Sequence, residues 1–502
     1  WYEAHLVVKD SLDVYGVTFP GAPTIIIGFN QHVAWGVTNT GGDVGDWYVE
    51  SVDDPARPTR YRVDGAWRDF SSRTERFLAP DGTVLAVDTM LVSHRGPVVR
   101  EAGRVLSYRW TAHEPSREID GFLTAARATS VAEWQAAMLP YRAPTQNMLV
   151  ADRAGTIAIR SHGTYPVRGP GVNGGYVVDG RTTTADWQGE LPLAQEPQAT
   201  NPAQGFLVSA NQQPFDPAVV PTYIGGHWAD PWRAIRLNEL LRADARVTPD
   251  AMRRYQTDPL SVRARTLVPL LLAAAGEGDA RLAPALSLLR DWDFRYTLDA
   301  RAPVLFQTAM RAIARRTWDE LIPPGGSRPI AAPTELALVQ LLRDSSSVWW
   351  DSRATPARED RRAIVVAGLA AAYDSLVTTL GPIGPAWAWE RAGGANVNHL
   401  LRLPGFSRRG LAVTSGNGTV APSAGAGASH GASWRMIVEL GRDRRTAWAI
   451  YPGGQSGNPA SRRYADRLER WRTGQLDSLL VPPTVEALPR DRVAATLVLS
   501  PR

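Results

Sequence analysis

Short apolar runs separated by turn residues characterise the first 230 residues. Residues 24–29 and 32–37 are two such runs on either side of an Asn-Gln pair, and this pattern predicts a buried hairpin. Residues 147–150 and 156–159 predict a second hairpin around a turn that contains aspartate and glycine. Ser130 lies three residues before a glutamate, which is the spacing of a capping box, and predicts a helix between the two hairpins. Residues 1–230 therefore form the predicted sheet-rich part of the chain.

The spacing of apolar residues changes toward 3.6 in residues 231–380. Leu237, Leu240 and Leu241 fall on one helical face. Thr248-Pro249-Asp250 combines a capping hydroxyl with proline at the first helical position, which predicts the start of a helix. We expect this block to be mainly helical.

Extended patterns return in residues 381–502. Residues 433–440 and 446–451 predict a hairpin, and residues 464–471 predict a final amphipathic helix. The order of strands, helices and strands predicts an α+β protein whose sheets draw on both ends of the chain.

Cysteine is absent from the 502 residues, and the 55 basic residues are arginines except for Lys9. The absence of cysteine excludes disulfide scaffolds, cysteine-ligated zinc and thiol nucleophiles. Lys9 lies in neither a P-loop nor an S-x-x-K motif, which excludes these lysine-dependent sites. The net charge of +5 is spread along the chain, so we expect no nucleic-acid partner. The apolar run at residues 267–275 contains a proline and is flanked by charges, so no membrane span is expected.

Several short motifs have both a functional and a structural interpretation. Residues 169–174 match the G-x-G-x-x-G pattern, but an extended Tyr-Val-Val segment follows, which favours a plain glycine-rich loop. Residues 427–431 place Ser429 in a G-x-S-x-G pattern before a predicted strand, whereas a nucleophile elbow precedes a helix. Asp43 and Asp46, beside glycines, could ligate a hard cation such as calcium or form a solvated turn. The eight histidines show no zinc-binding spacing.

Several segments, in chain order, carry a resemblance to a known family. The most specific is Gly28-Phe29-Asn30-Gln31-His32-Val33-Ala34-Trp35-Gly36-Val37-Thr38-Asn39. Together with the other segments it strongly resembles the β chain of the penicillin acylase family of N-terminal nucleophile hydrolases. Those other segments are residues 20–23, 43–48, 201–212, 231–236, 430–435 and 454–459.

This resemblance implies the four-layer αββα fold, with the helical block as an elaboration of it. It also implies an amidohydrolase that cleaves an acyl side chain from an amide through an acyl-enzyme. In that family a precursor cuts itself, and the serine at the new N-terminus is the nucleophile, with its own α-amino group as the base. No organic cofactor is implied.

Carried over by position, the resemblance assigns the oxyanion hole to the backbone N–H of Asn39 and the side-chain amide of Asn211. Arg233 matches the arginine that orients this asparagine and the N-terminal amine. Without the resemblance, Asn211 is interpreted as a turn cap and Arg233 as a surface charge at a helix start. A bulky residue that narrows the acyl pocket in benzylpenicillin-selective members is replaced by Gly41, with Val37 nearby, so we expect a roomier pocket.

The resemblance also implies a structural calcium ion. A further family carboxylate falls near Thr222 here, where Asp216 or Asp230 could replace it. The other expected ligands are Asp43, the carbonyl of Gly45 and Asp46.

The largest departure from the family pattern is that its N-terminal serine is not in this sequence. The chain begins at Trp1, in a segment that resembles one a short way inside the β chain, so we expect this polypeptide alone to be inactive. The expected partners are the α chain from the same precursor and a small-molecule acyl amide substrate. Family members are exported, so a periplasmic or secreted location is expected. Two alternatives stay open: a secreted binding protein that keeps the fold without a nucleophile, and a serine esterase that uses Ser429.

Overall fold

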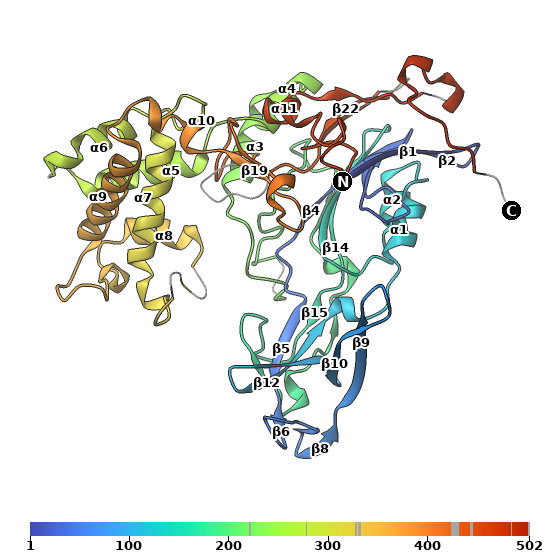
Figure 1. The fold of residues 1–502 in the computed structure, drawn as a ribbon, viewed down its shortest axis with the longest axis horizontal. Coiled ribbons are helices and arrows are strands. Elements are labelled where there is room, and N and C mark those ends of the chain that lie inside the picture. The colour runs from blue at the N-terminus through green and yellow to red at the C-terminus, as the bar shows by residue number, and fades with distance from the viewer. Residues whose placement is uncertain are drawn as a thin grey trace. The chain divides into compact units, whose positions relative to one another are not determined.

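The computed structural model describes residues 1–219, 222–277, 279–326, 329, 333–422, 431–441, 445–482 and 484–499. These residues form two compact units (Figure 1). The first, here called the N-terminal unit, is Ala4–Ala229. The second, here called the C-terminal unit, is Asp230–Arg502 together with Trp1–Glu3. The helical block and the segment that follows it therefore belong to one compact unit.

One sheet of the N-terminal unit contains both predicted hairpins. Its strands pair in the order β1, β2, β3, β4, β13, β14 and β18. Gly28 pairs with Trp35 in the first hairpin and Val150 pairs with Ala158 in the second, so both predictions are confirmed. The antiparallel pairing of β4 with β13 places the two hairpins side by side. The strand bounds are β1 Tyr2–Val8, β2 Leu12–Thr18, β3 Ile27–Phe29, β4 Val33–Asn39, β13 Gln146–Asp152, β14 Ile157–His162 and β18 Gln198–Thr200.

A pair of short helices precedes β13 in this unit. The hydroxyl of Ser130 accepts a hydrogen bond from the N–H of Glu133 at 3.2 Å, so the predicted helix start is confirmed. Trp134 of the second helix is fully buried, and its ring lies 6.1 Å from that of Trp35 on β4. This helix therefore covers the face of the sheet on which Trp35 lies. The helices are α1 Glu118–Ala125 and α2 Val131–Ala137.

A second sheet begins shortly after β4 ends. The loop of residues 40–44 leads from β4 into β5, which lies between β16 and β12 in a sheet of order β16, β5, β12, β11, β10 and β9. This loop therefore connects the two sheets. The bounds are β5 Gly45–Val49, β9 Ser71–Leu78, β10 Val84–Ser93, β11 Gly96–Glu101, β12 Arg104–Trp110 and β16 Val178–Asp179. Shorter pairings join β6 Ser51–Val52, β7 Arg60–Val63 and β8 Ala66–Asp69, and β15 Pro166–Val167 with β17 Gly189–Glu190.

The C-terminal unit begins with a block of helices, as the periodicity of residues 231–380 predicts. The hydroxyl of Thr248 accepts from the N–H of Ala251 at 3.2 Å, which confirms the predicted start of α4. Within the core, α7 and α9 approach closely at Gly368, where a Cβ would lie 2.4 Å from Cγ1 of Ile313. The helices are α3 Trp232–Ala243, α4 Pro249–Gln256, α5 Val262–Ala275, α6 Ala283–Arg290, α7 Ala302–Thr317, α8 Glu335–Arg343, α9 Arg361–Leu380 and α10 Trp389–Ala392.

Among the described residues, α9 is long and apolar enough to cross a membrane by length and composition. Sequence patterning singled out a different stretch, residues 267–275. A core helix of a globular unit passes the same test, and α9 packs in the core of this unit through buried residues that include Ile364, Val365, Leu369 and Ala372.

The last part of the C-terminal unit contains the predicted hairpin and a shorter helix than predicted. β21 and β22 pair from Arg435 opposite Ile450 onward, so the predicted hairpin is confirmed. The predicted helix over residues 464–471 is too long, because α11 begins only at Leu468. The N–H of Arg467 donates to the carbonyl of Gly453, which ties the preceding backbone to a loop instead of a helical turn. The remaining bounds are β19 Ala395–Val397, β20 Arg408–Leu411, β21 Arg435–Leu440, β22 Arg445–Ile450, β23 Asp477–Ser478 and α11 Leu468–Arg472.

Candidate active site

The main-chain polar groups of Asn39 point away from the neighbouring strand β13. Asn39 is the last residue of β4 and lies opposite Gln146. The N–H of the next residue, Thr40, donates to the carbonyl of Thr145 at 3.5 Å. Because hydrogen-bonded and non-hydrogen-bonded positions alternate along an antiparallel pair, both the N–H and the C=O of Asn39 are directed to the other side of β4.

Asn211 lies on that side. Its amide Nδ2 donates to the carbonyl oxygen of Asn39 at 2.8 Å. Asn211 has a left-handed backbone with φ of 66°, which asparagine adopts more readily than most residues. Its carbonyl accepts from the N–H of Ala229 at 3.0 Å, which holds this segment in place. The structure therefore brings together the two predicted oxyanion donors, Asn39 and Asn211, at the end of β4.

A set of buried and half-buried polar side chains supports these two residues. Ser209 Oγ lies 2.5 Å from Oγ1 of Thr38 and accepts from Nδ2 of Asn147 at 3.2 Å. The hydroxyl of Ser161 donates to Oδ1 of Asn147 at 2.5 Å. No sequence motif singles out these supporting residues. The signal in the sequence is Asn147, a polar residue at the start of an apolar run. The structure shows it only 1% exposed, and buried polar groups require partners.

The predicted pocket residues, Val37 and Gly41, lie on β4 and on the loop that follows it. Val37 is half-buried and lies opposite Met148. A Cβ at Gly41 would lie 2.4 Å from the carbonyl oxygen of His227 and 2.8 Å from the Trp228 ring. The segment that carries Trp228 therefore fills the space directly beside Gly41. The roomier acyl pocket stays a prediction.

Arg233 belongs to the C-terminal unit. It lies in the first turn of α3, directly after the buried Trp232. Burial lowers the pKa of the Arg233 guanidinium. Arg233 is thus more enclosed than a surface charge at a helix start, the interpretation that its sequence position alone favours.

Asp43 and Asp46 share one arginine as their partner. Nε of Arg168 donates to Oδ2 of Asp46 at 2.9 Å, while Nη2 lies 3.1 Å from Oδ1 of Asp43. Nε1 of Trp187 also donates to Oδ2 of Asp46 at 2.5 Å, and the hydroxyl of Tyr223 donates to Oδ2 of Asp43 at 2.7 Å. Burial and the Asp43 hydrogen bond raise the pKa of Tyr223, so its hydroxyl stays a donor at neutral pH.

These residues do not fit the expected calcium ion, because the carboxylates that it would need already bind a guanidinium, a phenol and an indole. Among the described residues, no group of three or more histidine, aspartate or glutamate side chains is placed to hold a metal ion. The two substitute carboxylates are placed differently: Asp216 accepts from the N–H of Ala218 at 2.9 Å, and Asp230 belongs to the C-terminal unit.

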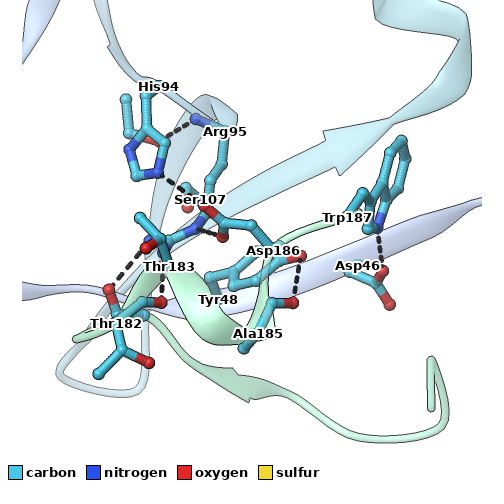
Figure 2. A network of polar contacts seen from close by, with 12 residues as sticks. Asp46, Tyr48, His94, Arg95, Ser107, Thr182, Thr183, Ala185, Asp186 and Trp187 are labelled. Carbon is cyan, nitrogen blue, oxygen red and sulfur yellow. Dashed lines mark hydrogen bonds and ion pairs between the residues drawn. The ribbon is translucent and has the colours of Figure 1, made fainter. Parts of the chain in front are cut away.

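A second buried arginine extends this polar region (Figure 2). Arg95 lies between Glu50 and Asp186, with nitrogen to oxygen distances of 3.0 and 2.7 Å, and its side chain is fully buried. Burial alone lowers the pKa of Arg95, but the carboxylates of Asp186 and Glu50 outweigh it and raise that pKa. Nε2 of His94 lies 3.2 Å from Oδ2 of Asp186 (Figure 2). Trp187, the residue after Asp186, donates its indole N–H to Asp46 (Figure 2). The network thus links the two buried arginines through one short segment.

The penicillin amidase family model matches residues 1–484. This chain belongs to the penicillin amidase family. The resemblance found in the sequence is therefore confirmed.

Two relatives of this penicillin amidase chain carry different names. An acyl-homoserine lactone acylase, QuiP, from Pseudomonas syringae pv. syringae is 29% identical over 513 residues, covering 93% of this chain and 61% of the relative. A penicillin acylase 2 proenzyme from a Pseudomonas species is 27% identical over 526 residues, covering 99% and 64%. The chain thus spans somewhat more than three-fifths of the length of these relatives.

A solved structure shows the fold of this penicillin amidase chain. The thermostable penicillin G acylase from Alcaligenes faecalis matches with a TM-score of 0.74 at 20% sequence identity, covering 100% of this chain and 94% of that one. This match confirms the predicted α+β fold of the N-terminal nucleophile hydrolases.

Two sequence motifs remain: the glycine-rich residues 169–174 and the serine motif of residues 427–431. The glycine-rich residues 169–174 lie in a loop between β15 and β16, which confirms the plain-loop interpretation over a dinucleotide site. Ser429 lies outside the described residues.

Proposed function

We propose that the protein to which this chain belongs is an amidohydrolase that cleaves small-molecule acyl amides through an acyl-enzyme. The observation that carries the proposal is the position of the Asn211 amide on the side of β4 to which the N–H of Asn39 points. Two donors that converge from a strand end and a fixed loop can stabilise the oxyanion of a tetrahedral intermediate.

The proposed reaction begins when a serine hydroxyl adds to the amide carbonyl carbon and its proton passes to the serine's own α-amino group. The carbonyl oxygen becomes an oxyanion that accepts from the Asn39 N–H and the Asn211 amide. The C–N bond then breaks, and the proton goes to the leaving amine. Water adds to the resulting ester, and the acid leaves as the serine is restored.

The nucleophile, the partner and the location belong to the proposal as well. We propose that self-cleavage of a precursor exposes a serine upstream of Trp1, and that an α chain from the same precursor completes the protein. We also propose that the protein is exported to the periplasm or the exterior, as its family membership implies. The names of the two relatives suggest the first substrates to assay, an N-acyl-homoserine lactone and an acylated β-lactam.

The test replaces Asn211 with alanine in the complete protein and measures release of the free amine from both substrates. Loss of one oxyanion donor is expected to reduce kcat by about 10² to 10³, with little change in KM. Gln340→Ala is the matched control, because it also removes a side-chain amide, but an exposed one on α8 of the C-terminal unit. An unchanged kcat in Asn211→Ala would refute the proposed oxyanion hole.

Mass spectrometry of the acyl-enzyme locates the nucleophile in the same preparation. The expected label is on an N-terminal serine. A label on Ser429 would instead support the esterase alternative. A mature protein without any N-terminal nucleophile, and without amidase activity, would support the binding-protein alternative.

A further inference from the structure

Arg168 lies where a cation is required between two acidic residues. Asp43 belongs to the loop of residues 40–44 and Asp46 to β5, and their carboxylates are 17% and 0% exposed. The Arg168 side chain is 3% exposed. Two carboxylates removed from water in this way need positive charge close by, because burial without it is very costly.

The guanidinium contacts the same kinds of oxygen that a calcium ion would take. Its Nε lies 2.9 and 3.1 Å from the two carboxylate oxygens of Asp46. Its Nη2 lies 3.1 Å from a carboxylate oxygen of Asp43 and donates to the main-chain carbonyl of Asp43 at 3.0 Å. Calcium binds carboxylates and main-chain carbonyls together, so the guanidinium occupies the place of an ion among these oxygen ligands.

The glycine-rich loop that follows Arg168 packs against the Asp43 carboxylate. Arg168 directly precedes residues 169–174, and a Cβ at Gly174 would lie 1.8 Å from Oδ2 of Asp43. The loop therefore approaches the Asp43 carboxylate so closely that it leaves no room for a Cβ. The aromatic ring of Tyr223 lies under the guanidinium, 5.2 Å away, while its hydroxyl donates to Asp43.

We infer that Arg168 is the built-in cation of this loop, and that it makes the loop of residues 40–44 independent of a divalent metal ion. A guanidinium is covalently attached, always charged and forked, so it can bridge the two acidic residues without an ion being taken up from solution. Asn39 directly precedes this loop, so an effect of Arg168 on catalysis through Asn39 rests on the proposed function. The consequence for stability does not.

The first experiment measures the Tm of the complete wild-type protein in EDTA and in millimolar calcium chloride, with calorimetric titration of calcium. We expect the same Tm in both buffers and no calcium binding at this site. A Tm that falls in EDTA and is restored by calcium would overturn the inference, provided that Asp43→Asn abolishes the restoration.

The second experiment measures the Tm of Arg168→Ala and Arg168→Lys in the complete protein. Arg168→Ala is expected to lower the Tm by roughly 6 °C or more, because it leaves buried carboxylates unpaired. Millimolar calcium is expected to recover part of that loss, since the two carboxylates and the carbonyl are then available to an ion. Arg168→Lys keeps the charge without the fork, so a smaller fall is expected.

Arg181→Ala is the matched control, because Arg181 pairs with Asp179 on the surface. It is expected to change the Tm little and to show no calcium response. If Arg168→Ala proves as stable as the wild type, the inference is wrong. If it does not fold, the wild-type calcium measurements still decide the question. Stability without calcium and loss of amidase activity in Asn211→Ala are separate readouts, so failure of one proposal does not imply failure of the other.

Discussion

The Nδ2 of Asn211 donates to the main-chain carbonyl of Asn39 at 2.8 Å, across 172 residues of sequence. The bond fixes the asparagine amide on the side of β4 to which the Asn39 N–H also points. Donors held in advance in this way need no reorganisation when charge develops on a substrate oxygen. The groups that hold these two residues are therefore expected to affect kcat more than KM.

Ser209→Ala is expected to reduce both stability and kcat. Its hydroxyl bridges the half-buried Thr38 and the buried Asn147, so its loss removes a partner of the Asn147 amide and costs about 1–3 kcal/mol in the free energy of unfolding. Urea denaturation and steady-state kinetics measure the two effects. Ser116→Ala removes an exposed hydroxyl and is expected to change kcat little. Equal behaviour of the two variants would contradict a supporting role for Ser209.

Gly41→Ala is expected to destabilise the protein by about 1–3 kcal/mol, because the added Cβ overlaps the carbonyl oxygen of His227. Gly36→Ala, on the preceding strand β4, is the matched control, since a Cβ there would have no other atom within 4 Å. Chemical denaturation compares the two variants with the wild type. Loss of stability in both variants alike would show that the contact with His227 is not responsible.

Glu50→Gln is expected to destabilise the N-terminal unit strongly. It removes one of two carboxylates that neutralise the fully buried Arg95, and breaking a buried pair costs about 3–5 kcal/mol. Asp179→Asn breaks an exposed pair with Arg181 and is expected to cost less than about 1 kcal/mol. The comparison uses the midpoint and slope of urea unfolding. A similar small cost in both variants would mean that Asp186 alone compensates Arg95.

His162 is expected to make stability fall in mild acid. Burial lowers the pKa of His162 to about 3, against an unfolded value near 6.5. Its contribution is complete above pH 6.5 and is lost as the pH falls toward 3, because the unfolded state binds the proton first. The loss at pH 4.5 is about 2–3 kcal/mol.

His162→Phe tests this pH dependence, because phenylalanine keeps a ring near Trp134 and does not titrate. The quantity to measure is the difference in unfolding free energy between wild type and variant from pH 7 to pH 4.5. Other titrating groups contribute to both proteins and cancel in this difference. A difference that stays constant over the range would exclude a role for His162.

The sequence by itself determined the local elements and the family. The hairpins around residues 24–37 and 147–159, the caps at Ser130 and Thr248 and the segment Gly28–Asn39 are all encoded by neighbouring residues. Turn residues, capping hydroxyls and apolar periodicity act over a few positions, so they can be recognised without a structure. The same locality explains the helix that was predicted too long, since the N–H of Arg467 donates to the distant carbonyl of Gly453 and α11 begins only after it.

The partner of each polar residue depends on the folding of distant segments against one another. Arg168 lies 122 residues from Asp46, and no pattern near either residue reveals that a guanidinium stands where an ion was expected. The sequence likewise shows a glycine at position 41 but not the Trp228 segment that fills the space beside it. Charges and hydrogen bonds find their partners where sheet register and loops bring distant segments together, and this pairing is a property of the folded chain.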